Sequence, residues 1–103
     1  MERIYKINQG LNRRFPDGND PFQIITRLAE ECGELAAQVN HFECSGVKRE
    51  KHGEPDRARL AKEVMDVLRC ALQIAMYYGL EAEVETAVKQ SYTKMKTEGL
   101  IDE

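Results

Sequence analysis

The stretch RLAEECGELA, residues 27–36, has the pattern of a long helix that carries acidic groups beside an apolar stripe. Working outward from it, we expect a helix from about Pro21 to Phe42. Its apolar side chains recur at helical spacing: Ile24, Ile25, Leu28, Cys32, Leu35 and Val39. Asp20 suits the N-cap position, and Gln23 completes a capping-box-like pattern. The sequence therefore predicts a helix whose start is fixed by side-chain hydrogen bonds.

Three further helices are predicted around this one. A short first helix spans about Glu2–Leu11, the third runs from about Pro55 to a left-handed Gly79, and the fourth spans about Glu81–Lys96. The third is apolar over much of its circumference, so we expect it to be the central, most buried helix. Because no strand pattern, repeat or second domain is indicated, residues 1–103 are predicted to form one all-α domain with a four-helix, bundle-like fold.

Size and composition narrow the classes of function. A chain of 103 residues builds only a modest core, and leftover apolar helix surface favours self-association, so a homo-oligomer is expected. The net charge of −3 offers no broad basic surface to nucleic acid. No apolar run approaches the roughly 20 residues of a membrane helix, and the first ten residues lack a secretory apolar core, which favours a cytoplasmic protein.

The three cysteines do not indicate a disulfide framework. Cys32 and Cys70 fall in apolar helical patterns and are expected in the core. The spacing of His41 and Cys44 is that of half a zinc site, and His52 follows, but no second pair completes the usual four ligands, so structural zinc is a minor alternative. Residues 43–56 read as a polar loop with basic side chains that could reach a phosphate: Lys48, Arg49 and Lys51.

A second acidic pair, Glu63 and Asp66 in AKEVMDVL, decides between a solvated acidic face and a metal site. Both carboxylates border the apolar face of the third helix, where an unpaired charge costs several kcal/mol. Lys62 and Arg69 are expected to point toward the other side and to be poor partners. Arg59, one turn from Glu63, keeps a structural ion pair open as the alternative to a bound metal.

The long loop allows the second and third helices to lie antiparallel, so that Glu30, Glu31 and Glu34 face Glu63 and Asp66 across a seam. Like charges three or four residues apart repel, by about 1 kcal/mol at 4 Å in water. A hard divalent cation would offset this repulsion, and we expect Mg²⁺, for which Mn²⁺ could substitute. Such an ion clamps phosphate oxygens and activates water, while a glutamate outside its inner shell takes the proton.

These two motifs together resemble the MazG-like all-α nucleoside triphosphate pyrophosphohydrolases. Residues 30–36 read EECGELA, close to that family's EExGEL, and residues 63–68 read EVMDVL, like its ExxDVL. YYGLEAE, at 77–83, resembles the family's link between the third and fourth helices. The resemblance covers about residues 24–96 and implies hydrolysis of a nucleoside triphosphate between its α and β phosphates, giving monophosphate and pyrophosphate.

The resemblance also implies roles for the acidic residues. Mg²⁺ would be bound by carboxylates at four positions: Glu31, Glu34, Glu63 and Asp66. Glu30 and Glu31 would act in catalysis, Glu30 by binding metal or by orienting the attacking water. Family members form dimers or tetramers with sites near subunit seams, so a homodimer or homotetramer is implied here.

Phosphate and base recognition are less defined by the resemblance. Family members often end the fourth helix with a lysine and a nearby arginine that hold phosphates, and here Lys94 and Lys96 stand without an arginine. The aromatic residues that could stack on a base, or else belong to the core or an interface, are Phe15, Phe42, Tyr77, Tyr78 and Tyr92. Two alternatives stay open: a phosphoribosyl-ATP pyrophosphatase-like enzyme, and a helical regulatory or oligomerisation module that binds a nucleotide without turnover.

Overall fold

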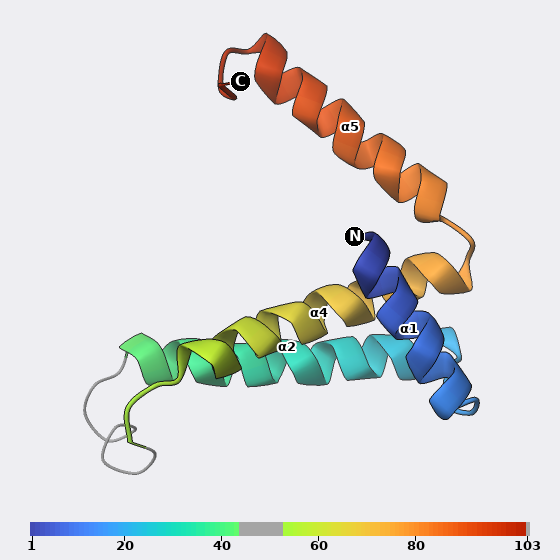
Figure 1. Cartoon of the computed structure of the whole chain (residues 1–103), viewed down its shortest axis with the longest axis vertical. Helices are drawn as coiled ribbons and strands as arrows, with labels where there is room; N and C mark the ends of the chain where they lie inside the picture. The colour runs from blue at the N-terminus through green and yellow to red at the C-terminus, as the bar shows by residue number, and fades with distance from the viewer. Residues whose placement is uncertain (44–52, 103) are drawn as a thin grey trace.

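The structure is a computed structural model that describes residues 1–43 and 53–102. Its described residues form four α-helices and no strand (Figure 1), which confirms the predicted all-α class. The helices are α1 (Glu2–Arg14), α2 (Pro21–Glu43), α4 (Arg57–Tyr77) and α5 (Glu81–Thr97). The basic loop side chains Lys48, Arg49 and Lys51, and the zinc candidates Cys44 and His52, lie outside the described residues.

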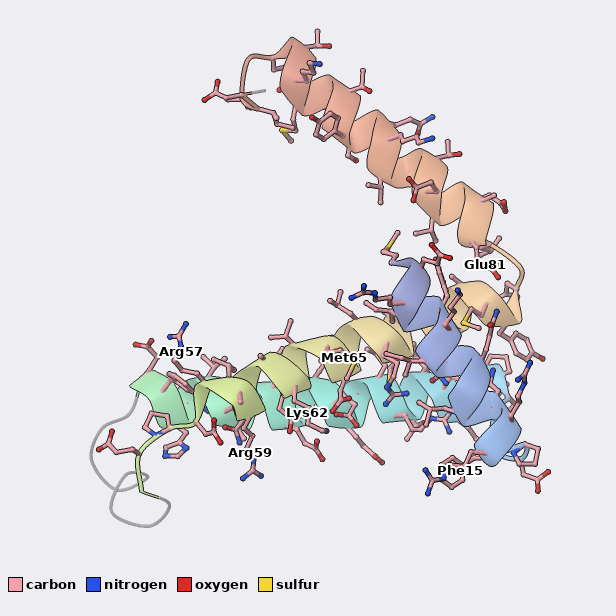
Figure 2. The ribbon with its side chains drawn as sticks, in the orientation of Figure 1. Phe15, Arg57, Arg59, Lys62, Met65 and Glu81 are labelled. Carbon is pink, nitrogen blue, oxygen red and sulfur yellow. The ribbon has the colours of Figure 1, made fainter. Side chains whose placement is uncertain are left out.

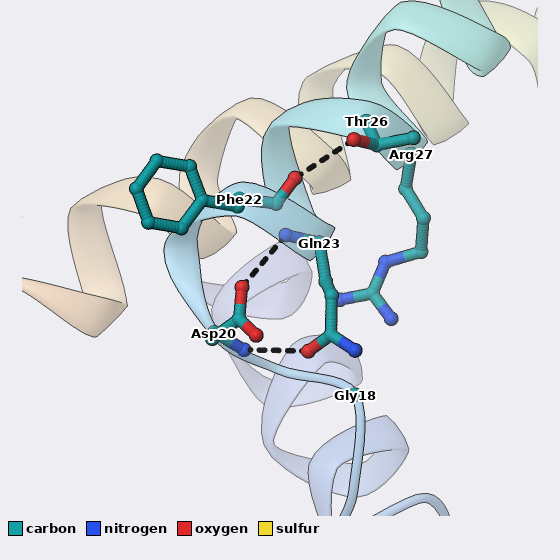
Figure 3. Close-up of a pocket in the computed structure, with 6 residues that line it drawn as sticks. All are labelled: Gly18, Asp20, Phe22, Gln23, Thr26 and Arg27. Carbon is teal, nitrogen blue, oxygen red and sulfur yellow. Dashed lines mark hydrogen bonds between the residues drawn. The ribbon is translucent and has the colours of Figure 1, made fainter.

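Side-chain caps fix where α2 and α4 begin. At α2 the Gln23 amide N–H donates to Asp20 Oδ1 at 2.8 Å, and the Asp20 amide N–H donates to Gln23 Oε1 at 3.2 Å, as the capping-box pattern predicted (Figure 3). α4 begins at Arg57 rather than at Pro55, because the carboxylate of Asp56 accepts from the amide N–H of Ala58 at 2.9 Å.

A left-handed glycine ends α4 and sets the direction in which the chain leaves it. Gly79 has φ +65°, as predicted, and the last residue inside the helix is Tyr77. The Gly79 amide donates to Met76 O at 3.2 Å, and the Leu80 amide donates to Ala75 O at 2.7 Å. These two bonds form a Schellman motif, which satisfies the carbonyl groups that the helix end would leave free.

α2 and α4 lie antiparallel along their lengths, and α1 crosses α4 near one end of this pair (Figure 1). Most of the buried residues lie on α4, which confirms the prediction that it is the central helix. The apolar core is small and consists of Ile24, Cys70, Leu72 and Ala75. Cys70 is therefore a core residue as predicted, whereas the prediction for Cys32 is wrong because its side chain is exposed.

α2 is rotated relative to the apolar stripe read from the sequence. Ile25 and Val39 belong to that stripe, yet they are 50% and 45% exposed. The face that turns toward α4 runs instead through the buried Ile24 and a series of half-buried residues: Leu28, Glu31, Leu35, Gln38 and Phe42. This rotation brings an acidic side chain, Glu31, into the seam between the two helices.

α5 extends away from the other helices after the Gly79 turn (Figure 1). It has no buried residue, and its main contact with another helix is with α4. Its apolar side chains recur at helical spacing but stay about half exposed: Val88 at 51%, Tyr92 at 43% and Met95 at 43%. The expected self-association stays a prediction, and this uncovered stripe is a surface on which it could take place.

Candidate functional site

Three carboxylates meet in the seam between α2 and α4. Glu31 comes from α2, while Glu63 and Asp66 come from α4, and one oxygen of each lies within 4.8 Å of the others. Glu63 and Asp66 are each 7% exposed, and Glu31 is half-buried. Lys62 and Met65 mark this part of α4 in Figure 2. The structure therefore brings together acidic residues from the two motifs that the sequence singled out.

Helical spacing explains why these three side chains converge. Glu63 and Asp66 are three residues apart, so they share one face of α4. On α2, Glu31 lies three residues after Leu28 and four before Leu35, and both leucines are half-buried in the seam. The antiparallel packing of α2 on α4 then sets the two acidic faces opposite each other. We call Glu31, Glu63 and Asp66 the acidic cluster.

Two carboxylates of the acidic cluster have an oxygen that receives no hydrogen bond from the described residues. Glu31 Oε2 and Glu63 Oε2 are both buried, and neither has a hydrogen-bond partner among the described residues. Burial raises the pKa of Glu31, and the neighbouring charges of Glu34, Asp66 and Glu63 raise it further, together with a hydrogen bond to Glu34. A bound cation would act in the opposite direction and lower the pKa of Glu31, because it favours the charged carboxylate.

Two cationic side chains, Lys62 and Arg69, contact Asp66. The prediction that they point toward the other side and are poor partners is therefore wrong. Lys62 Nζ lies 2.7 Å from Asp66 Oδ2, and Arg69 Nε lies 3.8 Å from Asp66 Oδ1. Residues three and four apart are neighbours on a helix, and these long side chains reach along it to the carboxylate. The pKa of Lys62 is raised, chiefly by its hydrogen bond to Asp66.

Glu63 has no such cationic partner in the part of the chain that the structure describes. The expected alternative, an ion pair between Arg59 and Glu63, does not occur among the described residues, and Arg59 is exposed. An unpaired carboxylate that is only 7% exposed is costly to bury. The buried oxygens of Glu31 and Glu63 are thus left without a partner from the described residues.

The chemistry of the acidic cluster fits a hard divalent cation. Mg²⁺ binds oxygen at about 2.0–2.1 Å, so ligands on opposite sides of it lie about 4 Å apart. Oxygens that already lie within 4.8 Å of one another need only small side-chain movements to share one ion. Two of the three carboxylates have a buried oxygen without a hydrogen-bond partner among the described residues. A divalent cation would offset the negative charge of these carboxylates.

The other predicted site residues lie outside the acidic cluster. Glu34 is exposed on α2, close enough for its charge and a hydrogen bond to act on Glu31. Glu30 is exposed on the same helix. Lys94 and Lys96 lie in the last turn of α5, and Figure 1 shows that this helix points away from the seam of α2 and α4. The structure does not bring these two lysines to the acidic cluster of their own chain.

A buried asparagine that the sequence analysis missed attaches α1 beside the site. Asn8 is 0% exposed, and its Nδ2 donates to the carbonyl oxygen of Arg69 at 2.9 Å. Its position was detectable, because Asn8 follows Ile4 by four residues and precedes Leu11 by three, so it lies on the buried side of the first helix. The bond connects α1 to the turn of α4 that also contacts Asp66.

The raised pKa of Glu31 predicts how the stability of the metal-free protein depends on pH. Its folded-state pKa lies above the ordinary value of 4.5, so protonated Glu31 stabilises the folded state below that pH. This contribution is lost as the pH rises through the folded pKa. We expect Glu31→Gln to flatten the pH dependence of the melting temperature, measured in chelator above pH 4.5. An unchanged profile would contradict the assigned environment.

None of the described helices is both long and apolar enough to span a membrane. Comparisons with curated proteins and with solved structures found no significant match. The profile of the MazG nucleotide pyrophosphohydrolase domain matches residues 20–98, which include α2, α4, α5 and all three residues of the acidic cluster. With most of its length matched and an all-helical fold that carries the paired acidic motifs, this chain belongs to the MazG nucleotide pyrophosphohydrolase domain family.

Proposed function

We propose that the protein hydrolyses nucleoside triphosphates to nucleoside monophosphate and pyrophosphate, with Mg²⁺ as cofactor. The acidic cluster is the observation that supports this proposal most strongly, because its oxygens converge within 4.8 Å and are partly unpartnered. Proposed ligands are Glu31, Glu63 and Asp66, with Glu34 as a fourth that a side-chain rotation would bring in. Membership of the family supports the reaction class.

In the proposed reaction, water attacks the α-phosphorus. A new P–O bond forms to the water oxygen, the bond from the α-phosphorus to the bridging oxygen breaks, and pyrophosphate leaves with that oxygen and its electron pair. Bound Mg²⁺ would polarise the phosphate oxygens and lower the pKa of a coordinated water. Glu30 is exposed next to Glu31, and we assign to these two glutamates the orientation of the water and the acceptance of its proton.

Lys62 and Arg69 are proposed as cations for the substrate phosphates, a role that the sequence analysis gave to Lys94 and Lys96. Both lie at the acidic cluster, since each contacts Asp66. Lys62 is also 65% exposed along its side chain, so it can turn from Asp66 to a phosphate when a metal takes that carboxylate. Lys94 and Lys96 would act only in a homodimer or homotetramer, in which another copy brings its α5 to the site.

Because Lys62 pairs with Asp66, Lys62→Ala is expected to strengthen Mg²⁺ binding and to weaken binding of the triphosphate. Removing the ammonium group at 2.7 Å from Asp66 frees that carboxylate, so the Mg²⁺ concentration that gives half the thermal shift should fall. The KM for the triphosphate should rise by about tenfold, because a charge-assisted hydrogen bond contributes about 1.5–3 kcal/mol. Lys89→Ala, on the exposed surface of α5, is the matched control. An unchanged KM would remove Lys62 from the phosphate site.

Separation of the reaction products tests the proposed function. The protein is incubated with a nucleoside triphosphate and Mg²⁺, and the products are separated by ion exchange. Monophosphate together with pyrophosphate supports attack at the α-phosphorus. Diphosphate together with orthophosphate contradicts it, and nucleotide binding in calorimetry without any product would favour the regulatory module instead.

A further inference from the structure

A cavity of about 200 Å³ lies beside the acidic cluster, and of its lining residues only Arg69 has a role in the proposed reaction. Arg27 lines it one turn before Glu31 on α2, and Arg69 lines it one turn after Asp66 on α4. One helical turn is about 5.4 Å, so the cavity and the cluster are neighbours along the same seam. The other polar and aromatic lining residues come from α4, from α1 and from the segment that follows α1: Gln73, Asn12, Phe15 and Asn19.

Three buried polar atoms on these lining residues have no hydrogen-bond partner among the described residues. They are the acceptors Asn12 Oδ1 and Gln73 Oε1 and the donor Arg27 Nε. Gln73 is only 5% exposed. A buried polar group left unpaired costs about 1–3 kcal/mol, so their grouping around one cavity points to a ligand that would pair them.

The guanidinium among these groups is held in place. Arg27 Nη2 donates to Asn19 Oδ1 at 3.1 Å, which restrains the guanidinium at the cavity. Phe15 is 57% exposed at the same cavity, and the Arg14 guanidinium lies 5.6 Å from the centre of its ring (labelled in Figure 2). The cavity thus combines fixed polar groups with an accessible aromatic ring, as a site for a planar, polar ligand requires.

Two acceptors and one donor call for a ligand edge with two donors and one acceptor. An exocyclic amino group beside a ring nitrogen has this edge, as in cytosine (N4 and N3) and in adenine (N6 and N1). At the same two positions, uracil and hypoxanthine carry a carbonyl oxygen beside a ring N–H, so they offer one donor there instead of two. Either would leave at least one of the three buried groups unpaired.

The size and position of the cavity agree with a base rather than with a whole nucleotide. Its volume of about 200 Å³ is below the range of about 300–1,000 Å³ for pockets that enclose drug-sized ligands. A ligand whose base occupies the cavity would have its sugar and phosphates extend toward the acidic cluster, one helical turn away. Phe15 would contribute a stacking face.

We propose that this cavity, between α1 and the seam of α2 and α4, binds the base of the substrate and selects bases that carry an exocyclic amino group. The inference rests on the proposed function, in that the base belongs to the nucleotide cleaved at the acidic cluster. Asn12 and Gln73 accept from the amino group, and Arg27 donates to the ring nitrogen. These residues determine specificity and take no part in bond breaking.

Paired substrates test the selection. kcat/KM is measured for CTP against UTP and for ATP against ITP, pairs in which a carbonyl oxygen replaces the amino group and the adjacent ring nitrogen gains a hydrogen. In any pair whose ring enters the cavity, we expect kcat/KM to be about tenfold or more higher for the nucleotide with the amino group. The nucleotide with the carbonyl oxygen leaves a buried polar group unpaired. A preference shown for CTP alone or for ATP alone would identify the ring that the cavity holds. Equal rates within both pairs, or a preference for UTP and ITP, would overturn the proposal.

Variants of Asn12 separate an acceptor role from a donor role. Asn12→Asp keeps the acceptor oxygen and should keep the preference for the amino base, whereas Asn12→Leu should reduce the ratio by about tenfold. Asn40→Leu, at an exposed position of α2, is the matched control and should keep the ratio. If Asn12→Asp shifts the preference to UTP, an amide N–H reads the base and the assignment is overturned.

Binding of monophosphates distinguishes failure of this inference from failure of the proposed function. CMP against UMP, and AMP against IMP, are titrated into the full chain by calorimetry, which requires no hydrolysis. Tighter binding of the amino member supports the cavity assignment even in a protein that cleaves no triphosphate. Equal binding within both pairs overturns the assignment even if triphosphates are cleaved.

Discussion

Glu63→Gln is expected to reduce kcat by at least about 100-fold and, at the same time, to raise the melting temperature of the metal-free protein. The loss of activity follows because a proposed Mg²⁺ ligand loses its charge. The gain in stability follows because the carboxylate is 7% exposed and has a buried, unpartnered oxygen beside Glu31 and Asp66. Turnover is measured by pyrophosphate release, and stability by thermal unfolding in chelator.

A matched change on the surface serves as the control. Glu83→Gln makes the same chemical change at an exposed position of α5, so kcat and the melting temperature in chelator should stay near those of the original protein. The opposite signs of the two effects make the Glu63 test strict, because simple damage to the fold would lower both quantities. Full activity in Glu63→Gln would remove that carboxylate from the site.

Mg²⁺ is expected to raise the melting temperature of the protein strongly. The acidic cluster gathers three carboxylates within 4.8 Å, and a ligand at 100 times its Kd stabilises the folded state by about 2.7 kcal/mol. For a domain of this size, 1 kcal/mol corresponds to about 4–8 °C, so an increase of about 10–20 °C is expected at saturation. Differential scanning fluorimetry across a Mg²⁺ titration measures it.

Two controls separate binding at the site from general screening of charge. NaCl at equal ionic strength screens exposed charges but cannot bridge Glu31 and Asp66, so it should give a much smaller shift. Asp66→Asn should remove most of the Mg²⁺ effect, whereas Glu83→Gln should keep it. A shift that NaCl reproduces, or that survives in Asp66→Asn, would show that the acidic cluster is not the binding site.

Local chemistry explains why much of the fold could be predicted from the sequence. The cap formed by Asp20 and Gln23 and the left-handed Gly79 depend on contacts within a few residues, and both appear where the pattern placed them. The two acidic motifs were also correctly set opposite each other, as far as Glu31, Glu63 and Asp66 are concerned, because helical spacing and an antiparallel pair suffice to bring them together.

Features that depend on how helices rotate against each other could not be predicted. The exposed Cys32 follows from the angle at which α2 packs on α4, which its own apolar pattern does not define. A helical wheel also treats side chains as short, so it missed that Lys62 reaches one turn forward along the helix to Asp66, at 2.7 Å. The placement of α5 depends on tertiary contacts, and these are few.

The uncovered stripe of α5, formed by Val88, Tyr92 and Met95, has a consequence for the stability of that helix. An isolated helix of fewer than about 12–15 residues is marginal in water, and one of 17 residues with no buried side chain gains little beyond that limit. Its amide protons should therefore exchange with solvent deuterium far faster than those of α4, whose core residues must unfold first. Whatever surface comes to cover Val88 and Tyr92 will also slow that exchange and keep α5 helical.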